Sequence, residues 1–176
     1  MVKLLKFLAY ILFFIFALIY FLPKQSLYYL AEQELEKQQV VLSNEEIVEK
    51  IFSLELQHST LSYQSISSAE IAYIDIKLLA FYNLIIIHDI NISSVASTFI
   101  PLNINSVEMK QTLLNPLNVV FKAQGEFGEA EGVFYILDKN VSLTLKPSSL
   151  MLKEYKSTLR ELHKNEKGEY QYDQTF

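Results

Sequence analysis

The chain has 176 residues, no cysteine, 51% hydrophobic residues and a formal net charge of −5 at pH 7. A sequence without cysteine excludes disulfides and cysteine-ligated metal sites. The acidic balance, with Arg160 as its single arginine, argues against nucleic acid as a partner, because phosphate binding needs clustered Lys and Arg.

An unbroken apolar run from Phe7 to Leu22 is the most informative segment. Crossing a hydrocarbon core of about 30 Å takes roughly 20 helical residues, a length that the run reaches with Leu4, Leu5 and the stem of Lys6. We therefore predict a single transmembrane helix over residues 7–23. Its anchoring side chains are Phe7, Leu8, Ile11, Leu12, Phe13, Phe14, Ile15, Phe16, Leu18, Ile19, Phe21 and Leu22.

A cleavable signal peptide is the alternative interpretation of this segment. Such a peptide needs small residues at its cleavage site, in an A-x-A-like pattern. Here the run ends in bulky residues and Pro23, and nothing small follows until Ser26. The sequence favours a retained anchor.

Charge predicts how the anchor is oriented. Lys3 and Lys6 precede the run, whereas Lys24 follows it and is soon succeeded by three glutamates, Glu32, Glu34 and Glu36. Positive flanks stay on the cytoplasmic side. We expect residues 1–6 in the cytoplasm, the anchor in the inner membrane and the bulk of the chain in the periplasm.

Residues 24–40 are predicted to form a juxtamembrane helix or stalk. Leu27, Leu30, Ala31 and Leu35 fall near one helical face, which suits either a simple stalk, the favoured interpretation, or a packing surface for a neighbouring subunit. Next, Ser43 to Glu46 match the S/T-x-x-E capping box. This predicts a short helix from Asn44 to about Phe52, with Ile47, Val48 and Ile51 facing inward.

From Leu54 onward the apolar pattern has a period of two, typical of strands. Strands that follow closely, without long helices between them, favour an antiparallel meander. The residues 138–140 predict a tight hairpin turn, because Asp and Asn tolerate turn conformations. The alternating sets are Leu54/Leu56, Ile74/Ile76/Leu78, Leu84/Ile86/Ile90/Ile92, Val107/Met109, Leu117/Val119/Phe121, Val133/Tyr135/Leu137 and Val141/Leu143/Leu145.

The end of the chain predicts a helix and then a tail. Glycines and glutamates mix in residues 125–132, so a phosphate cradle is disfavoured and a wide hairpin bend is expected. Ser148 is predicted to cap a helix to about Lys164, with Leu152, Tyr155, Leu159 and Leu162 packing on the sheet. Residues 41–164 thus form a β-rich domain in an α+β fold. Residues 165–176 are expected to be a flexible tail or an added edge strand.

No catalytic constellation is evident, and no catalytic, cofactor-binding or metal-binding residue is predicted. His58, His88 and His163 lack metal-ligand spacing, and the side chains of His88 and Asp89 should lie on opposite faces of a strand. A nucleophile elbow of the G-x-S-x-G type does not occur in the sequence. Tyr28, Tyr29, Tyr170 and Tyr172 are candidate partner contacts, because core packing does not obviously involve them.

The sequence resembles GspN-like inner-membrane proteins linked with type II secretion. The likeness lies in Phe21-Leu22-Pro23, in residues 41–45, and in the Pro116 strand that leads into residues 125–128. It implies a β-rich periplasmic domain within a multi-protein envelope machine and no catalytic residues. By size, anchor and composition alone, the chain is also similar to small periplasmic accessory proteins of elaborated bacterial flagellar motors (PflD-like proteins).

Three hypotheses follow. The leading one is a non-enzymatic structural or scaffold protein that docks onto larger periplasmic or inner-membrane partners of an envelope complex, with multiple copies in a ring as one arrangement. The alternative is a lipid-binding or transfer module with a grooved sheet, similar to AsmA-like proteins. A minor third is an enzyme or metal protein built around His58, His88 and the few aspartates.

Overall fold

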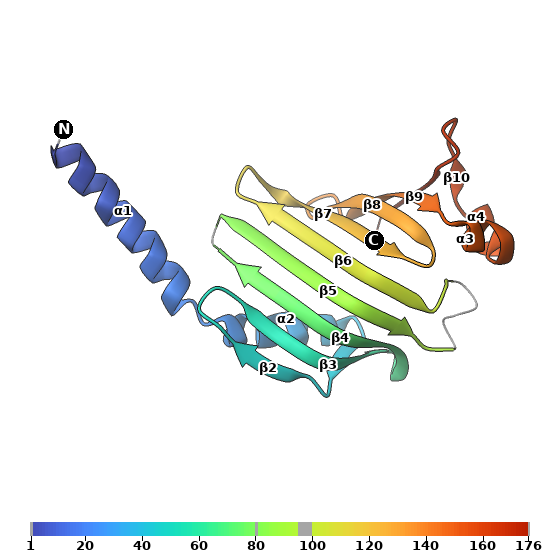
Figure 1. The fold of residues 1–176 in the computed structure, drawn as a ribbon, viewed down its shortest axis with the longest axis horizontal. Helices are drawn as coiled ribbons and strands as arrows, with labels where there is room; N and C mark the ends of the chain where they lie inside the picture. The colour runs from blue at the N-terminus through green and yellow to red at the C-terminus, as the bar shows by residue number, and fades with distance from the viewer. Residues whose placement is uncertain (1, 80, 95–99, 176) are drawn as a thin grey trace.

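The computed structural model describes residues 2–79, 81–94 and 100–175. Within them, one long helix, α1 (Val2–Phe21), precedes a second, α2 (Lys24–Lys37), and a single antiparallel sheet follows (Figure 1). Its strands are β1 (Val40–Ser43), β2 (Glu46–Glu49), β3 (Leu54–Tyr63), β4 (Ile66–Leu78), β5 (Tyr82–Ile92), β6 (Asn103–Thr112), β7 (Asn115–Gly125), β8 (Gly128–Tyr135), β9 (Asn140–Pro147), β10 (His163–Lys164) and β11 (Tyr170–Thr175). Two short helices, α3 (Ser149–Glu154) and α4 (Lys156–Arg160), lie between β9 and β10.

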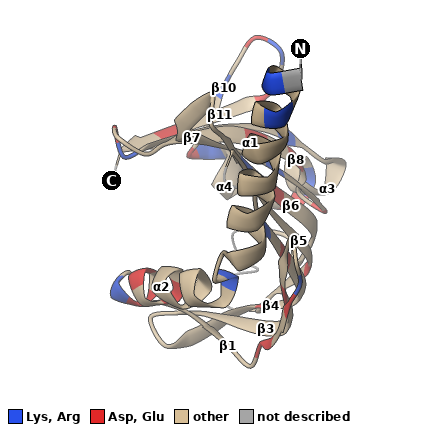
Figure 2. Cartoon of the chain, turned by 90° about the vertical axis from the view of Figure 1, so that its left-hand side faces the viewer, with Lys and Arg blue, Asp and Glu red and all other residues tan. Residues whose placement is uncertain are grey.

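Spatial order in the sheet follows chain order almost throughout. In the described residues the strands run β1-β3-β4-β5-β6-β7-β8-β9-β11-β10, with β2 also paired to β3. Viewed end-on, the sheet curves into an open C in cross-section, and α2 lies across one arm (Figure 2). The predicted α+β architecture with a large antiparallel sheet is confirmed.

The inner face of the curved sheet is apolar. In three neighbouring strands, β3, β4 and β5, the alternation of inward-facing and outward-facing side chains shifts by one residue partway along the strand. Leu54 and Leu56 of β3 are buried, but after His58 it is Ser59 that is buried. His58 and Asp89 have φ of 55° and 52°, a left-handed conformation that disturbs the alternation of side chains. Both residues are opposite Ala72 in the strand registers. Three neighbouring strands therefore reverse their inward faces at one level of the sheet.

This reversal corrects the predicted phase of β5. In its first half the residues that pack on the core are Ile85 and Ile87, not Leu84 and Ile86. Because Leu84 to Ile87 form a continuous apolar run, periodicity could not decide between the two faces. Strand β8 is out of phase as well, since Phe134 lines the inner face together with Phe121 of β7, whereas the sequence favoured Val133 and Tyr135.

Two buried clusters hold the inner face at its two sides. The first joins Tyr28 of α2 to β3, β4 and β5 through residues such as Leu54, Ile71 and Ile74. The second joins Phe127 and Leu145 of the sheet to Met151 and Leu159 of α3 and α4. The helices before and after the sheet therefore cover opposite arms of the C.

Tyr28 fixes α2 to the sheet with both its ring and its hydroxyl. The ring belongs to the first cluster and is 7% exposed, and the hydroxyl donates a hydrogen bond to Glu45 Oε1 at 2.9 Å. Burial, followed by this carboxylate, raises the pKa of Tyr28 well above its usual range. By contrast Leu27, Leu30 and Leu35 are exposed, so the predicted apolar face of α2 does not pack on the sheet.

Two local predictions are wrong. The capping-box helix from Asn44 to Phe52 is absent; β2 (Glu46–Glu49) pairs with β3 instead. Asn44 has φ of 65°, which serves a turn between β1 and β2 rather than a helix start. The expected wide bend at residues 125–132 is a tight turn within the β7–β8 hairpin, in which Gly125 and Gly128 pair with each other.

The end of the chain also differs from its prediction. Ser148 caps a helix as expected, accepting a hydrogen bond from Met151 N at 3.1 Å. The helix breaks at Tyr155, ends at Arg160, and leaves Leu152 exposed. The segment expected as a flexible tail or edge strand contains β11, which pairs with β9. The hairpin turn at residues 138–140 is confirmed, with Lys139 at φ of 47°.

Replacing Tyr28 by Phe should destabilise the sheet domain, because it leaves the Glu45 carboxylate buried without its donor. The expected loss is about 1–3 kcal/mol in the free energy of unfolding, measured by urea denaturation of the full chain in detergent micelles. Tyr29→Phe is the matched control, because the Tyr29 side chain is 44% exposed. Equal stability of the two variants would contradict the role given to Tyr28.

Candidate binding groove

A hollow lies on the inner face near the end of the sheet that adjoins α1. Its volume is about 420 Å³. Apart from Asn83 and Gln111, whose side-chain amides hydrogen-bond at 3.1 Å, its walls are apolar. We call it the Phe134 hollow; it is lined by Leu78, Asn83, Ile85, Met109, Gln111, Val119, Phe121 and Phe134.

A second hollow continues from the first toward the opposite end of the sheet. It has a volume of about 480 Å³ and ends under α3 and α4. Phe121 lines both hollows, which therefore adjoin each other, and we call the two together the inner groove. The second hollow, which we call the Met151 hollow, is lined by Ile100, Ile104, Phe121, Ala123, Phe127, Ala130, Leu143, Leu145, Met151, Thr158, Glu161, Leu162 and Tyr172.

Small residues make the floor of the groove deep. Ala123 and Ala130 are directly opposite each other in β7 and β8, and Gly132 pairs with Phe121 two positions along. A Cβ atom on Gly132 would lie 2.5 Å from the Phe121 ring and 2.3 Å from the carbonyl oxygen of Ser142. Glycine at this position therefore leaves the space that the Phe121 ring occupies.

The α3–α4 pair closes the far side of the Met151 hollow. Ser148 links it to the sheet: its hydroxyl donates to Glu126 O at 2.6 Å and accepts from Met151 N. The Met151 side chain is then buried between α3 and the sheet. The N-cap of a six-residue helix thus positions one wall of the groove.

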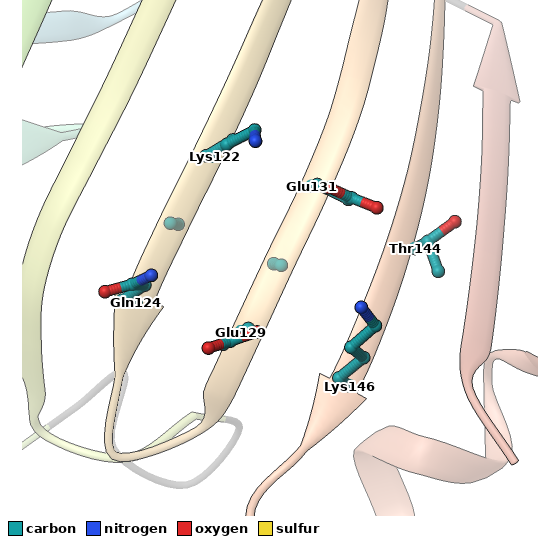
Figure 3. A pocket seen from close by; sticks show the side chains of 8 residues that line it. Lys122, Gln124, Glu129, Glu131, Thr144 and Lys146 are labelled. Atoms are coloured by element: carbon teal, nitrogen blue, oxygen red, sulfur yellow. The ribbon is translucent and has the colours of Figure 1, made fainter.

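Polar and charged side chains gather on the outer face of β7, β8 and β9. A shallow depression of about 100 Å³ crosses β7, β8 and β9, and its labelled side chains rise from one face of these strands (Figure 3). Opposite charges pair across the strands, with Lys122 opposite Glu131 and Glu129 opposite Lys146. Such cross-strand pairs stabilise a solvated sheet surface, and we assign no ligand to this depression.

Ion pairs continue along the outer face toward β3 and β4. Lys50 Nζ lies 2.5 Å from Glu55 Oε1, and this contact holds the pKa of Glu55 below its ordinary value. Burial, then the neighbouring Glu55, raises the pKa of Tyr73 to about 12. Both shifts favour the ordinary charge states of Glu55 and Tyr73 at neutral pH.

The three histidines considered in the sequence analysis lie on different strands. His58, His88 and His163 are exposed on β3, β5 and β10. Among the described residues, no group of three or more His, Cys, Asp or Glu side chains could hold a metal ion.

The four tyrosines considered as partner contacts also separate. Tyr28 is buried and Tyr29 exposed, while Tyr170 packs on the second buried cluster and Tyr172 lines the groove. The sequence suggested a grooved sheet only as the alternative hypothesis and did not locate the groove, although the Ala123, Ala130 and Gly132 pattern was a usable signal.

Within the described part of the chain, one helix (Lys3–Phe21) is long and apolar enough to cross a membrane. A signal sequence passes the same test of length and composition. Fold and groove together define a class: an α+β protein with one N-terminal apolar helix and a curved antiparallel sheet whose inner face is an apolar groove. No protein-family model, curated protein or solved structure matches the chain.

Removing the Ser148 hydroxyl should weaken the wall that closes the groove. Ser148→Ala is expected to cost about 1 kcal/mol in the free energy of unfolding, the usual effect of losing an N-cap. Ser149→Ala changes the exposed neighbour and should have little effect. Urea denaturation of both variants checks this, and a loss shared equally by the two would argue against the capping role.

Proposed function

We propose that this chain is a membrane-anchored protein whose inner groove binds the acyl chains of membrane lipids. The observation that carries the proposal is the pair of adjoining apolar hollows on the inner face, which share Phe121 as a lining residue. Ligand pockets for small molecules typically have volumes of about 300–1,000 Å³, and each hollow lies in this range. An apolar cavity gives water too few hydrogen-bonding partners to be filled stably, which favours hydrocarbon as the occupant.

Energetics suit reversible loading from a bilayer. Moving a methylene group out of water is favourable by about 0.8 kcal/mol, but a chain that moves from lipid into an apolar groove gains little, because both surroundings are apolar. Exchange between membrane and groove is then close to neutral in free energy. Such a groove is suited to carrying or passing on acyl chains rather than storing them.

Retention of α1 as an anchor is part of the proposal. The Phe16 and Phe52 rings lie 6.2 Å apart between their centroids, and Ile19 is buried. Lys24, which is also buried, forms an ion pair with Glu49 of β2 at 3.8 Å. These contacts support a helix that stays attached to the domain. With the charge distribution described above, residues 1–6 lie in the cytoplasm and the sheet domain in the periplasm beside the inner membrane.

Photocrosslinking tests the occupant. The full chain in lipid nanodiscs containing phospholipids with a diazirine on the acyl chain should give adducts on inner-face peptides of β7 to β9, besides those on α1. Leu143→Glu should remove the groove adducts, because burying a carboxylate among apolar walls is costly. Thr144→Glu, the next residue on the polar outer face, should keep them.

A second variant covers the case in which Leu143→Glu fails to fold. Ala130→Trp fills the floor of the groove with an apolar side chain, so it should lower the groove adducts while the α1 adducts persist. If adducts on the unmodified protein are confined to α1, the acyl-chain proposal is wrong.

A scaffold role is the second candidate, favoured by a free sheet edge. Among the described strands, β10 pairs only with Tyr170 and Gln171 of β11, so residues 172–175 have an open edge on the side away from β9. Open edges accept strands of partner proteins. The partners would be larger inner-membrane or periplasmic proteins of an envelope machine, such as a type II secretion-like apparatus or a flagellar motor.

A photoreactive amino acid placed at Asp173 in intact cells tests this second role. It should give a discrete cross-linked protein species, because the open edge of β11 would lie against a partner. The same group at Thr144, on the outer face within the sheet, should not. Identical cross-linking patterns at both positions would count against a partner at this edge.

A further inference from the structure

The loops at one end of the sheet lie on the side from which α1 leaves the domain. In an antiparallel meander alternate loops share an end, so the β2–β3, β4–β5, β6–β7 and β8–β9 connections lie together. Lys24 pairs with Glu49, the last residue of β2, which places the start of α2 at this same end. We call it the anchor end. Figure 1 shows α1 leaving the domain on the side where these loops project.

The loops of the anchor end expose large apolar side chains at their tips. Leu114 is 98% exposed, Leu137 71% and Leu113 68%, and Phe81 is half exposed. Backbone hydrogen bonds tie these loops to their neighbours: Leu113 N–H donates to Phe81 O of the β4–β5 loop, and Ile136 N–H donates to Leu117 O of strand β7, each at 2.9 Å. These apolar tips therefore form a connected rim across the end of the sheet.

The residue types in the turns of this rim are unusual. Tight turns ordinarily use Gly, Asn, Asp, Ser or Pro, whose conformational or hydrogen-bonding properties suit them. The β6–β7 turn instead has Leu113 and Leu114 at its apex. At the opposite end of the sheet the β3–β4 turn has Gln64 and Ser65, and Phe127 of the β7–β8 turn is buried. Exposed apolar surface that is clustered in this way marks an interaction site.

The rim also adjoins the mouth of the groove. Leu78 and Asn83, which flank the β4–β5 loop, line the Phe134 hollow, so this hollow extends to the end of the sheet at which the apolar tips lie. At the other end of the groove, Phe127 and the α3–α4 pair line the Met151 hollow. The Phe134 hollow is therefore the part of the groove that lies nearer to the apolar helix.

We propose that the apolar rim formed by Phe81, Leu113, Leu114 and Leu137 inserts into the bilayer that α1 spans. This inference rests on the proposed function, in which α1 is a membrane anchor. The rim would hold the Phe134 hollow against the leaflet in which α1 ends. Acyl chains then enter the Phe134 hollow from the leaflet without crossing water. A lipid surface fits the rim because its exposed tips are apolar and lie beside an apolar helix.

Single-tryptophan variants test the rim directly, because the natural chain contains no tryptophan. The full chain carrying Leu114→Trp is reconstituted into phosphatidylethanolamine and phosphatidylglycerol vesicles, with and without bromine on the acyl chains. Bromine quenches only indoles that reach the hydrocarbon, so emission from this variant should be lost in brominated vesicles. Phe13→Trp, in the middle of α1, is the positive control.

Leu102→Trp is the matched negative control, because Leu102 is an exposed leucine at the opposite end of the sheet. It should keep its emission in brominated vesicles. Equal quenching of Leu114→Trp and Leu102→Trp, or no quenching of Leu114→Trp, overturns the insertion of the rim. An unquenched Phe13→Trp overturns it as well, because the anchor itself then lies outside the bilayer.

The two proposals fail separately. Groove adducts together with an unquenched Leu114→Trp would leave acyl-chain binding intact and remove the rim. A quenched Leu114→Trp with adducts confined to α1 would keep the rim as a membrane contact and remove lipid binding in the groove.

Discussion

The arrangement depends on one constraint: a wide apolar sheet face has to be kept from water, and the chain supplies little to cover it. A sheet normally buries its apolar face against another layer. Here α2 covers one arm through Tyr28, and the short α3–α4 pair covers the other through Met151 and Leu159. Curvature accommodates the remainder, because a C-shaped sheet turns the uncovered part of its face into a groove.

Much of the fold could be predicted from local patterns. The apolar helix, the β-rich meander, the turn at residues 138–140 and the Ser148 cap each follow from a few neighbouring residues. Predictions were wrong where tertiary context overrides a local signal. Residues 43–46 fit a capping box, yet pairing with β3 places Glu46–Glu49 in a strand, and Tyr155 interrupts a helix whose apolar spacing looked continuous.

A grooved sheet could be suggested from the sequence, but the position and lining of the groove could not be predicted, because they depend on which face each strand turns inward. The run Leu84 to Ile87 is apolar on both faces, and the left-handed residues His58 and Asp89 reverse the pleat without any marker such as glycine. Its depth comes from Ala123, Ala130 and Gly132, which have meaning only when β7 and β8 are placed side by side. The fold can be predicted from the individual helices and strands, whereas the groove can be predicted only when the register between the strands is known.

Chain order and spatial order coincide from β3 to β9, and this has a consequence for biosynthesis. Each new strand can add to the one made just before it, so loop-closure entropy stays low and assembly should be fast. The covering α3–α4 pair is made only after β9, however. Until then the arm of the nascent sheet that α2 does not cover exposes its apolar face to water, the condition under which growing chains are most prone to aggregate.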